Sequence, residues 1–429
     1  MATFLPFRAS RYQQTTAGPL ATLVSEPYDK ITRAMLQAYR ASSPFNVTQV
    51  LLPAADVPPD QEAPAALYEQ AAAQFRSWVA RGIVMQDPEQ AFYLLRQTFQ
   101  IPGQSASATR TAILGRVQLV PWDRGEIMPH ERTLRGPKID RLALLRASGV
   151  HFGQIFMLYP DPEGDVATLM QTPGEPLASF EHGAGIQHEL IRLPGTVSKP
   201  ISDAMRERRL YIADGHHRYE TALAFAEERA AGPDDPAAYV LASLVSMQDP
   251  GLVVLPTHRV VHSLAAFSPN TLLEKLGALF EITPAQGLDP LVQSLVPGCR
   301  SLGLALKEGL YHLQLREDAD LKPYFQDAPA LWQASAVAIL HLAILEPILG
   351  IDAEAMARQT HLRYAREPQP PLEEVRTGHA QALFLLPPTP AQFVKEIADA
   401  GVRMPQKSTD FYPKLPTGTL FFDTTQSHA

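Results

Sequence analysis

The sequence predicts a mixed α/β protein of the α+β class, with a large N-terminal domain and a second, smaller α+β domain. Short apolar stretches bounded by turn residues, such as Tyr239–Met247, have the length and residue types of buried strands. Other segments, such as Ala65–Ala80, repeat apolar residues at helical spacing. With 429 residues, the chain is long enough for two or three domains of ordinary size.

Strands and helices alternate in the expected N-terminal region, where prolines punctuate many short segments. Strands are expected over residues 47–52, 91–99, 111–120, 153–158, 239–247 and 252–255. Helices are expected over residues 65–80, 138–147, 204–209 and 217–231. A strand over residues 210–212 is expected to lead through Gly215 directly into the last of these helices.

The pattern of segments changes after about residue 265. Helices are expected over residues 272–280, 328–349 and 390–400, and a hairpin over residues 301–315 turns at Glu308-Gly309. We therefore predict a boundary near residues 262–268. The predicted parts are a phosphate-binding domain (1–265), an α+β domain (266–403) and an irregular tail (404–429) that covers the N-terminal domain.

Composition excludes several classes of protein. The chain has 37 basic and 45 acidic side chains, and a net charge of −8 argues against a nucleic-acid partner bound through broad phosphate neutralisation. The single cysteine, Cys299, cannot form an internal disulfide. Polar residues interrupt the longest apolar stretch, 331–351, and Pro6 and Arg8 interrupt the N-terminal one. We expect a cytoplasmic protein with no membrane partner.

The most informative local sequence is LYIADGHHRYETA, residues 210–222. An apolar strand, a glycine and a helix follow one another without a gap, so unpaired backbone N–H groups and the positive end of the helix dipole point into the turn. Gly215 allows a phosphate to approach the backbone closely. Arg218 adds a planar fork for phosphate oxygens, and His216 and His217 add further donors.

Asp214 has the opposite charge at this turn. Its carboxylate has four possible uses: it caps the helix, orients a histidine, holds a divalent cation, or acts as a base toward a hydroxyl. The simpler alternative is an Asp N-cap on a surface helix whose His and Arg side chains are merely solvated. Neither Gly-x-x-x-x-Gly-Lys-[Ser/Thr] nor Gly-x-Gly-x-x-Gly at a strand end occurs, so any nucleotide is held by a shorter loop.

Three further motifs are candidates for an anion site. The first contains His130, Glu131 and Thr133, followed by Lys138; a zinc protease would need a second His where Leu134 stands. This loop either faces an anionic ligand or uses Thr133 only to cap the next helix. The second is His258-Arg259, at the end of an apolar strand. The third is Lys407-Ser408-Thr409 with Lys414, which either closes over a phosphate or packs as a tail.

The box IADGHHRYETA resembles one found in the ParB/sulfiredoxin superfamily, in which the free-serine kinases carry Asp-Gly-His-His-Arg. The whole chain is also similar to a poorly characterised bacterial and archaeal family of unknown function. The landmarks are PFRASRY (6–12), EPYDKI (26–31), PFNV (44–47), PHERT (129–133), LPTHRVV (255–261) and MPQKSTDFYPKLPTG (404–418). EPYDKI departs from that family's usual Pro-Pro-Tyr-Asp-Val-Ile at Glu26 and Lys30. The superfamily resemblance implies a ParB/sulfiredoxin-like N-terminal domain.

The resemblance also implies a small-molecule phosphotransferase, such as a kinase of free L-serine or a similar hydroxy acid. ATP, ADP or pyrophosphate would be the donor and Mg²⁺, on Asp214, the metal. Catalytic roles would fall to Asp214, His217 and Glu131, and the ligand would be a small phosphorylated molecule. The residues that would hold it are Gly215, His216, Arg218, His130, Thr133, Lys138, His258, Arg259 and Lys407.

Three alternatives remain open. The first is a nucleotide-binding switch without turnover, which would predict a helix-turn-helix and a basic face. The second is a metal-dependent phosphohydrolase that uses His130, Glu131, His216 and His217. The third is an enzyme relic that serves as a scaffold.

Overall fold

The computed structural model describes residues 2–58, 61–131, 135–326, 328–405 and 407–426. These residues form two compact units. Unit 1 comprises residues 2–129, 135–253 and 413–426, and unit 2 comprises residues 130–131 and 254–412 within the described ranges. Each unit combines a β-sheet with helices, so the predicted mixed α/β class is confirmed.

Unit 1 is built on one mixed sheet, in which the described part of the chain supplies nine strands. The order along the sheet is β6 (Ile127–Met128), β11 (Leu210–Asp214), β8 (Ile155–Tyr159), β12 (Tyr239–Ser246), β5 (Ser107–Gln118), β4 (Tyr93–Gln100), β10 (Ile186–Arg192) and β9 (Glu175–His182), with β1 (Phe4–Leu5) beside β5. β11 is antiparallel to β8, and Asp214 pairs with Phe156. The end of β11 therefore lies beside the start of β8.

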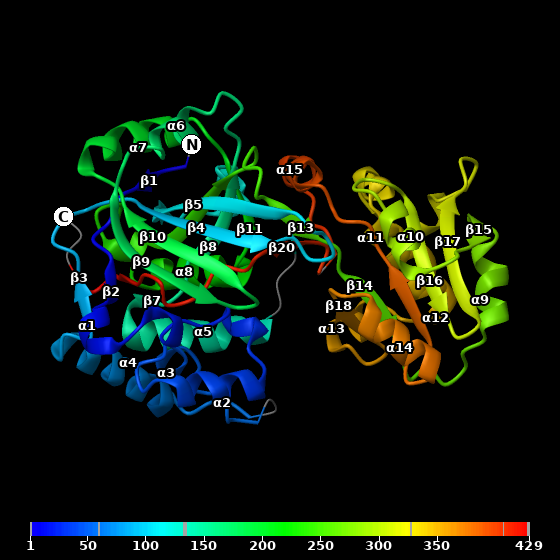
Figure 1. Cartoon of the computed structure of the whole chain (residues 1–429), viewed down its shortest axis with the longest axis horizontal. Coiled ribbons are helices and arrows are strands. Elements are labelled where there is room, and N and C mark those ends of the chain that lie inside the picture. Colours follow the sequence, from blue (N-terminus) through cyan, green and yellow to red (C-terminus); the bar gives the residue numbers. More distant parts are fainter. Residues whose placement is uncertain (1, 59–60, 132–134, 327, 406, 427–429) are drawn as a thin grey trace. The chain divides into compact units, whose positions relative to one another are not determined.

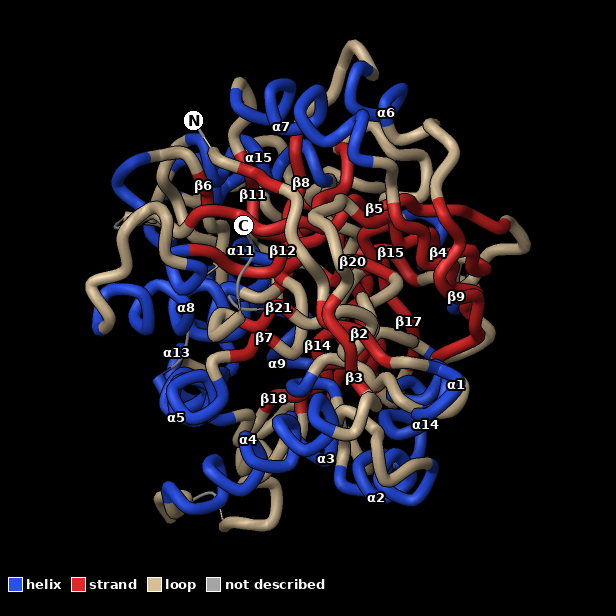
Figure 2. The backbone as a smooth tube through the Cα atoms, turned by 90° about the vertical axis from the view of Figure 1, so that its left-hand side faces the viewer, coloured by secondary structure: helices blue, strands red, loops and turns tan. Residues whose placement is uncertain are grey.

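Helices lie on both sides of this sheet (Figures 1 and 2). On one side are α6 (Asp165–Leu169) and α7 (Ser198–Arg206), and on the other are α2 (Arg33–Ser42), α3 (Thr48–Leu51), α4 (Ala65–Ala80) and α5 (Arg135–Ser148). α8 (His216–Glu228) follows β11 directly and packs against α5, β8 and β12. The helix predicted over residues 65–80 is confirmed by α4.

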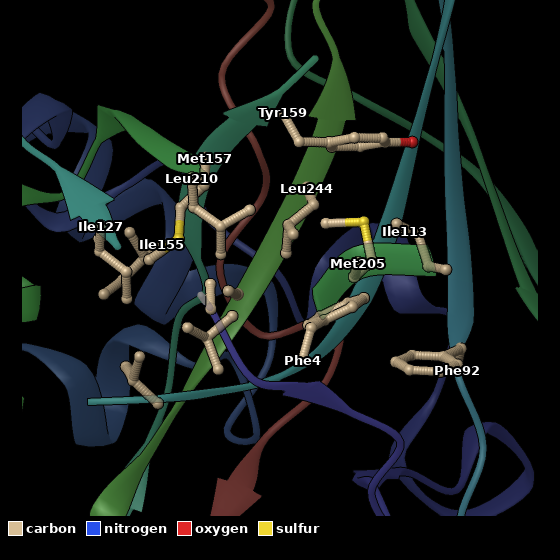
Figure 3. Close-up of a cluster of buried hydrophobic side chains, with 14 of the residues drawn as sticks. Phe4, Phe92, Ile113, Ile127, Ile155, Met157, Tyr159, Met205, Leu210 and Leu244 are labelled. Carbon is tan, nitrogen blue, oxygen red and sulfur yellow. The ribbon is translucent and has the colours of Figure 1, made fainter. Parts of the chain in front are cut away.

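The main core of unit 1 lies between the sheet and α7 (Figure 3). Ile155 and Met157 of β8, Leu244 of β12 and Met205 of α7 are all fully buried, and Phe4 packs with them. Burying each such side chain contributes roughly 1.5–3 kcal/mol. This packing fixes the strands, and with them the corner between β11 and α8.

Unit 2 is built on an antiparallel sheet of six strands in the described residues. Its order is β15 (Phe280–Pro284), β17 (Gly309–Leu315), β16 (Ser301–Leu306), β19 (Ala382–Leu385), β14 (His258–Val261) and β18 (Leu362–Ala365). The helices of this unit are α9 (Pro269–Leu276), α10 (Leu288–Ser294), α11 (Ala336–Ile339), α12 (Glu346–Leu349), α13 (Ala353–Arg358), α14 (Gln369–Thr377) and α15 (Ala391–Asp399). α10 and α14 pack on the sheet through a shared apolar cluster. The predicted hairpin over 301–315 is confirmed by β16 and β17.

Shorter pieces complete the two units. They are α1 (Gln14–Ala17), the pair β2 (Ser10–Tyr12) and β3 (Val84–Gln86), the pair β7 (Val150–His151) and β21 (Phe422–Asp423), and the pair β13 (Val253–Leu255) and β20 (Asp410–Tyr412). Among the described residues, no helix has the length and apolar character needed to cross a membrane.

Several predicted elements differ from the structure in type or in bounds. Residues 47–52 form the helix α3, not a strand, because the Asn46 carboxamide oxygen accepts from the N–H (3.0 Å) and hydroxyl (2.8 Å) of Thr48 and holds a helical turn. The helix predicted over 272–280 ends at Leu276, and Phe280 opens β15. The helix predicted over 328–349 is divided into a 3₁₀ turn (Ala330–Ala334), α11, a π-helical segment (Leu340–Leu345) and α12.

The division into units differs from the three parts predicted from the sequence. Unit 2 begins at Val254, about ten residues before the predicted boundary, because β14 pairs with β18 and β19 of that unit. The predicted tail is shared between the units: residues 404–405 and 407–412 belong to unit 2 and residues 413–426 to unit 1.

Candidate functional site

A glycine forms the corner between β11 and α8. Gly215 has a φ of 100°, a conformation that side chains disfavour, and it is the N-cap residue of α8. A Cβ atom at this position would lie only 2.9 Å from Arg218 Nη2. Arg218 therefore folds back over Gly215, and a glycine is needed both for the turn and for this close approach.

Asp214 points at two cations and does not cap the helix. Its Oδ2 accepts from Lys414 Nζ at 2.8 Å, and its Oδ1 lies 3.5 Å from Arg218 Nη2. Burial would raise the pKa of Asp214, but the positive charges of Lys414 and Arg218, the Lys414 hydrogen bond and the charge of Lys30 together outweigh burial. The pKa of Asp214 consequently lies well below its usual value of 3.8. The carboxylate is ionised at neutral pH, and about a fifth of its side chain is exposed.

The guanidinium of Arg218 is anchored at its other end. Its Nη1 donates to the backbone carbonyl of Gln154, just before β8. Arg218 also lines a cavity of about 60 Å³ in unit 1, together with Arg141, Tyr28 and Gly153. The Arg141 guanidinium lies over the Tyr28 ring, 4.8 Å from its centre. Two guanidinium groups and a phenol thus border one small cavity next to the corner.

The loop that contains Tyr28, Asp29 and Lys30 belongs to the same neighbourhood. Burial raises the pKa of Tyr28, and the adjacent Asp29 raises it further, while Arg218 and Arg141 lower it. Lys30 contributes to the low pKa of Asp214. The EPYDKI motif and the ADGHHRYETA box, almost 190 residues apart in sequence by their numbering, therefore meet in unit 1.

Lys414 reaches the corner on the C-terminal strap, which we define as residues 413–418. Its backbone is tied to four separate parts of unit 1. The hydrogen bonds are Arg110 Nη2 to Pro413 O, Gln97 Nε2 to Lys414 O (3.1 Å), Gln154 Nε2 to Pro416 O (3.0 Å) and the two backbone bonds between Ser25 and Thr417 (2.8 and 3.0 Å). The strap is thus a fixed part of the corner and not a loose tail.

The structure separates the predicted site residues into two groups. Asp214, Gly215, His216, His217, Arg218 and Lys138 belong to unit 1, whereas His130, Glu131, His258, Arg259 and Lys407 belong to unit 2. His216 is buried and His217 is half-buried, at the first two positions of α8. Lys138 of α5 pairs with Glu220 of α8. Thr133 lies outside the described residues.

In unit 2, the HERT and KST motifs bond to each other. His130 is fully buried, and its Nε2 lies 3.0 Å from the hydroxyl of Thr409. Glu131 Oε1 accepts from the backbone N–H of Ser408 at 3.2 Å. These two side chains therefore fix the loop at residues 407–409.

The LPTHR motif joins the same group in unit 2. His258 Nδ1 accepts from the Leu386 N–H at 3.2 Å, and burial, with the nearby charge of Arg259, lowers its pKa to about 4. The fully buried Arg259 donates from Nη2 to the carbonyl of Lys407 at 3.1 Å. Burial lowers the pKa of Arg259 to about 10, so it is charged at neutral pH. Three motifs that are far apart in sequence thus converge in unit 2.

The surroundings of Asp214 do not fit its predicted role as a Mg²⁺ ligand. Its two oxygens face an ammonium and a guanidinium group, which repel a divalent cation. Within the described ranges, no three His, Cys, Asp or Glu side chains are arranged to hold a metal ion. The four residues that a metal-dependent phosphohydrolase would use are divided between the two units.

Lys414 and Tyr28 are the site residues that the sequence alone could not assign to the corner. Each lies in a landmark motif of the family resemblance, EPYDKI or MPQKSTDFYPKLPTG, which was the available signal. The predicted site residues include Lys407 from the latter motif, whereas the lysine that pairs with Asp214 is Lys414. The contact depends on the path of the strap, which no local pattern encodes.

Several solved structures share part of this fold at low similarity. A conserved hypothetical protein from Pyrococcus furiosus is 13% identical with a TM-score of 0.34, covering 71% of this chain and 93% of that one. A free serine kinase in complex with AMP is 13% identical with a TM-score of 0.37, covering 76% and 94%. SbnI from Staphylococcus aureus, truncated at its C-terminus, is 12% identical with a TM-score of 0.35, covering 71% and 85%.

No curated protein matches the chain. The ParB/sulfiredoxin resemblance stays a prediction. A family model described as "Protein of unknown function (DUF1015)" matches residues 4–338, well over half of the sequence, and spans all of the landmarks except the last. The chain therefore belongs to the DUF1015 family of proteins of unknown function.

Proposed function

We propose that this protein is a small-molecule phosphotransferase whose phosphate-binding site is the corner at Asp214–Arg218. One observation carries the proposal: a strand–glycine–helix corner beside a cavity combines a helix N-terminus with the charges of Lys414 and Arg218, both oriented by Asp214. Lys414 comes from 200 residues further along the chain, so the arrangement is not a by-product of one local turn.

Phosphoryl transfer is catalysed chiefly by positioning and by neutralising negative charge on the transferred group. Arg218 offers a planar fork and Lys414 a compact charge for this purpose. Because the pKa of Asp214 is low, its carboxylate is a weak base at neutral pH. We therefore propose that Asp214 positions the two cations, and that Asp29, exposed beside Tyr28 of the cavity, accepts the proton of the attacking hydroxyl.

The cavity restricts what the corner holds. About 60 Å³ accommodates a phosphate group or a few water molecules and is too small for a nucleoside. A small hydroxy acid such as L-serine is the acceptor we propose, with ATP, ADP or pyrophosphate as donor. We propose that His217, which is half-buried at the start of α8, donates to a donor phosphate.

A labelled transfer assay tests the proposal. The full chain is incubated with γ-labelled ATP, β-labelled ADP or labelled pyrophosphate and a pool of hydroxy amino acids, with and without Mg²⁺. We expect labelled phosphoserine or a related phosphate ester, reduced about 100-fold or more in Arg218→Met, since removing one charge-stabilising donor typically costs 10²–10³ in rate. Asp29→Asn should lower kcat with little change in the donor's affinity.

The outcomes separate the alternatives. Ester formation that is unchanged in Arg218→Met would refute the corner as the site. Binding of the donor without any product would favour the nucleotide-binding switch, and free phosphate released without an acceptor would favour the phosphohydrolase. As a matched control, Arg206→Met changes an exposed arginine at the end of α7 and should leave activity intact.

A further inference from the structure

Unit 2 contains a cavity much larger than the one at the corner. Its volume is about 540 Å³, within the range of 300–1,000 Å³ typical of small-molecule sites. Tyr324, Trp332 and Tyr364 supply aromatic walls, and His341 and Glu346 supply polar groups. Aromatic and aliphatic walls with a few polar groups are the usual composition of a small-molecule pocket, and three aromatic rings suit a flat organic ligand.

His341, at the wall of this cavity, has a defined protonation state. Arg259 Nε donates to His341 Nε2 at 3.3 Å. A guanidinium has no acceptor, so His341 Nε2 must be the acceptor. Burial, with the charge of Arg259, lowers the pKa of His341 well below 6.5, and the ring is neutral at pH 7. Its single proton is therefore on Nδ1, which makes His341 a hydrogen-bond donor at that atom.

The contacts of Arg259 hold this wall of the cavity in place. The Arg259 guanidinium lies over the Tyr364 ring, 4.9 Å from its centre, and donates to the carbonyls of Thr257 and Lys407. His341 belongs to the π-helical segment Leu340–Leu345, and such insertions in helices are frequent at functional sites. A fixed aromatic face and a fixed donor are thus presented together. Glu346 is exposed, at the first turn of α12.

We propose that this cavity binds a flat heteroaromatic small molecule. The molecule stacks on the aromatic walls, accepts a hydrogen bond from His341 Nδ1 through a ring nitrogen or carbonyl, and donates an N–H to the carboxylate of Glu346. Every residue of this site belongs to unit 2, so the proposal does not depend on the phosphotransferase function of the corner in unit 1.

Calorimetric titration of the full chain tests this proposal, with adenosine, guanosine, indole and ribose as probes. We expect adenosine or guanosine to bind at least tenfold more tightly than indole, which lacks an acceptor, and ribose, which lacks the aromatic ring, not to bind. Glu346→Gln should weaken binding about fivefold. Ala353→Trp, at an exposed position that lines the cavity, should weaken it tenfold or more by filling the space.

Both variants change exposed residues, and circular dichroism checks that they are folded. Lys414→Met, in unit 1, should change the affinity for adenosine less than twofold. The proposal is overturned if neither nucleoside binds at millimolar concentration, or if Ala353→Trp binds the nucleoside as tightly as the unaltered chain. If Lys414→Met lost adenosine binding while Ala353→Trp kept it in full, the site would lie in unit 1, and the proposal would again be overturned.

Discussion

The corner in unit 1 and the cluster of His258, Arg259 and His341 in unit 2 use the same kinds of residue in opposite ways. At the corner, Lys414 and Arg218 face a carboxylate that is partly exposed, so an anion from solvent can compete for them. In unit 2, Arg259 and His258 are buried and bonded to backbone groups and to a second imidazole. Charge-bearing motifs therefore mark a ligand site only where solvent reaches the charges; elsewhere they hold walls and loops in place.

The largest effect that we predict concerns pH and unit 2. The pKa of His258 falls from 6.5 to about 4 on folding, so the unfolded chain binds its proton first as the pH drops. Stability is therefore lost as the pH falls from 6.5 toward 4 and levels off below that value, by on the order of 3 kcal/mol. Urea unfolding at a series of pH values measures how the free energy of unfolding falls between pH 6.5 and 4. This slope should be smaller in His258→Asn.

Asp214 loses its contribution with the same sign but at a lower pH, and hence provides a control. Because its folded pKa is depressed, its contribution is complete above pH 3.8 and is lost only as the pH falls below that value. Asp214→Asn should leave the slope between pH 6.5 and 4 unchanged. If Asp214→Asn altered that slope as much as His258→Asn does, the contrast between the two regions would be incorrect.

The second effect concerns the cation delivered by the C-terminal strap. Lys414→Met removes a charge from the corner and keeps much of the side-chain volume, so phosphoryl transfer should fall about 100-fold, or about 2.7 kcal/mol. Lys414→Arg should recover part of the rate. Lys199→Met, which removes an exposed surface lysine of α7, serves as the matched control. Equal rates in Lys414→Met and Lys199→Met would exclude the strap from the site.

The smallest effect concerns the glycine of the corner. Gly215→Ala places a Cβ in a left-handed conformation, at a cost of about 1–2 kcal/mol, and pushes Arg218 out of its position. Urea unfolding should show that loss, together with a weaker affinity for pyrophosphate. Gly232→Ala, where no neighbouring atom would meet the new methyl group, should change neither quantity, and a similar loss in both variants would contradict the special role of Gly215.

The sequence predicted the local structure of the corner but not its surroundings. Alternating strand and helix patterns identify β11, Gly215 and α8, because those signals lie within one short segment. The positions of Lys414 and Tyr28 depend on long-range packing. Arg110, Gln97 and Gln154 fix the strap, and the sequence around them does not indicate which backbone groups they bond. Residues 48–51 form the helix α3 because the Asn46 side chain bonds Thr48 at its start, a contact that the apolar pattern of residues 47–52 does not show.

The separation of the predicted site residues has the same origin. His130 and Glu131 lie only a few residues before α5 of unit 1, yet they bond to residues 408–409 in unit 2. Hydrogen bonds to residues nearly 280 positions away, and not the neighbouring helix α5, determine the unit to which these two residues belong. In addition, burial of His258 and Arg259 could not be distinguished from exposure at a strand end by pattern alone.

Calorimetric titration with pyrophosphate tests most directly whether the corner in unit 1 is an anion site. The unaltered chain should bind pyrophosphate, and Arg218→Met should bind it at least tenfold more weakly, while Arg259→Met, if folded by circular dichroism, should bind it as the unaltered chain does. Full affinity in Arg218→Met, or binding that is lost in folded Arg259→Met alone, would contradict the account.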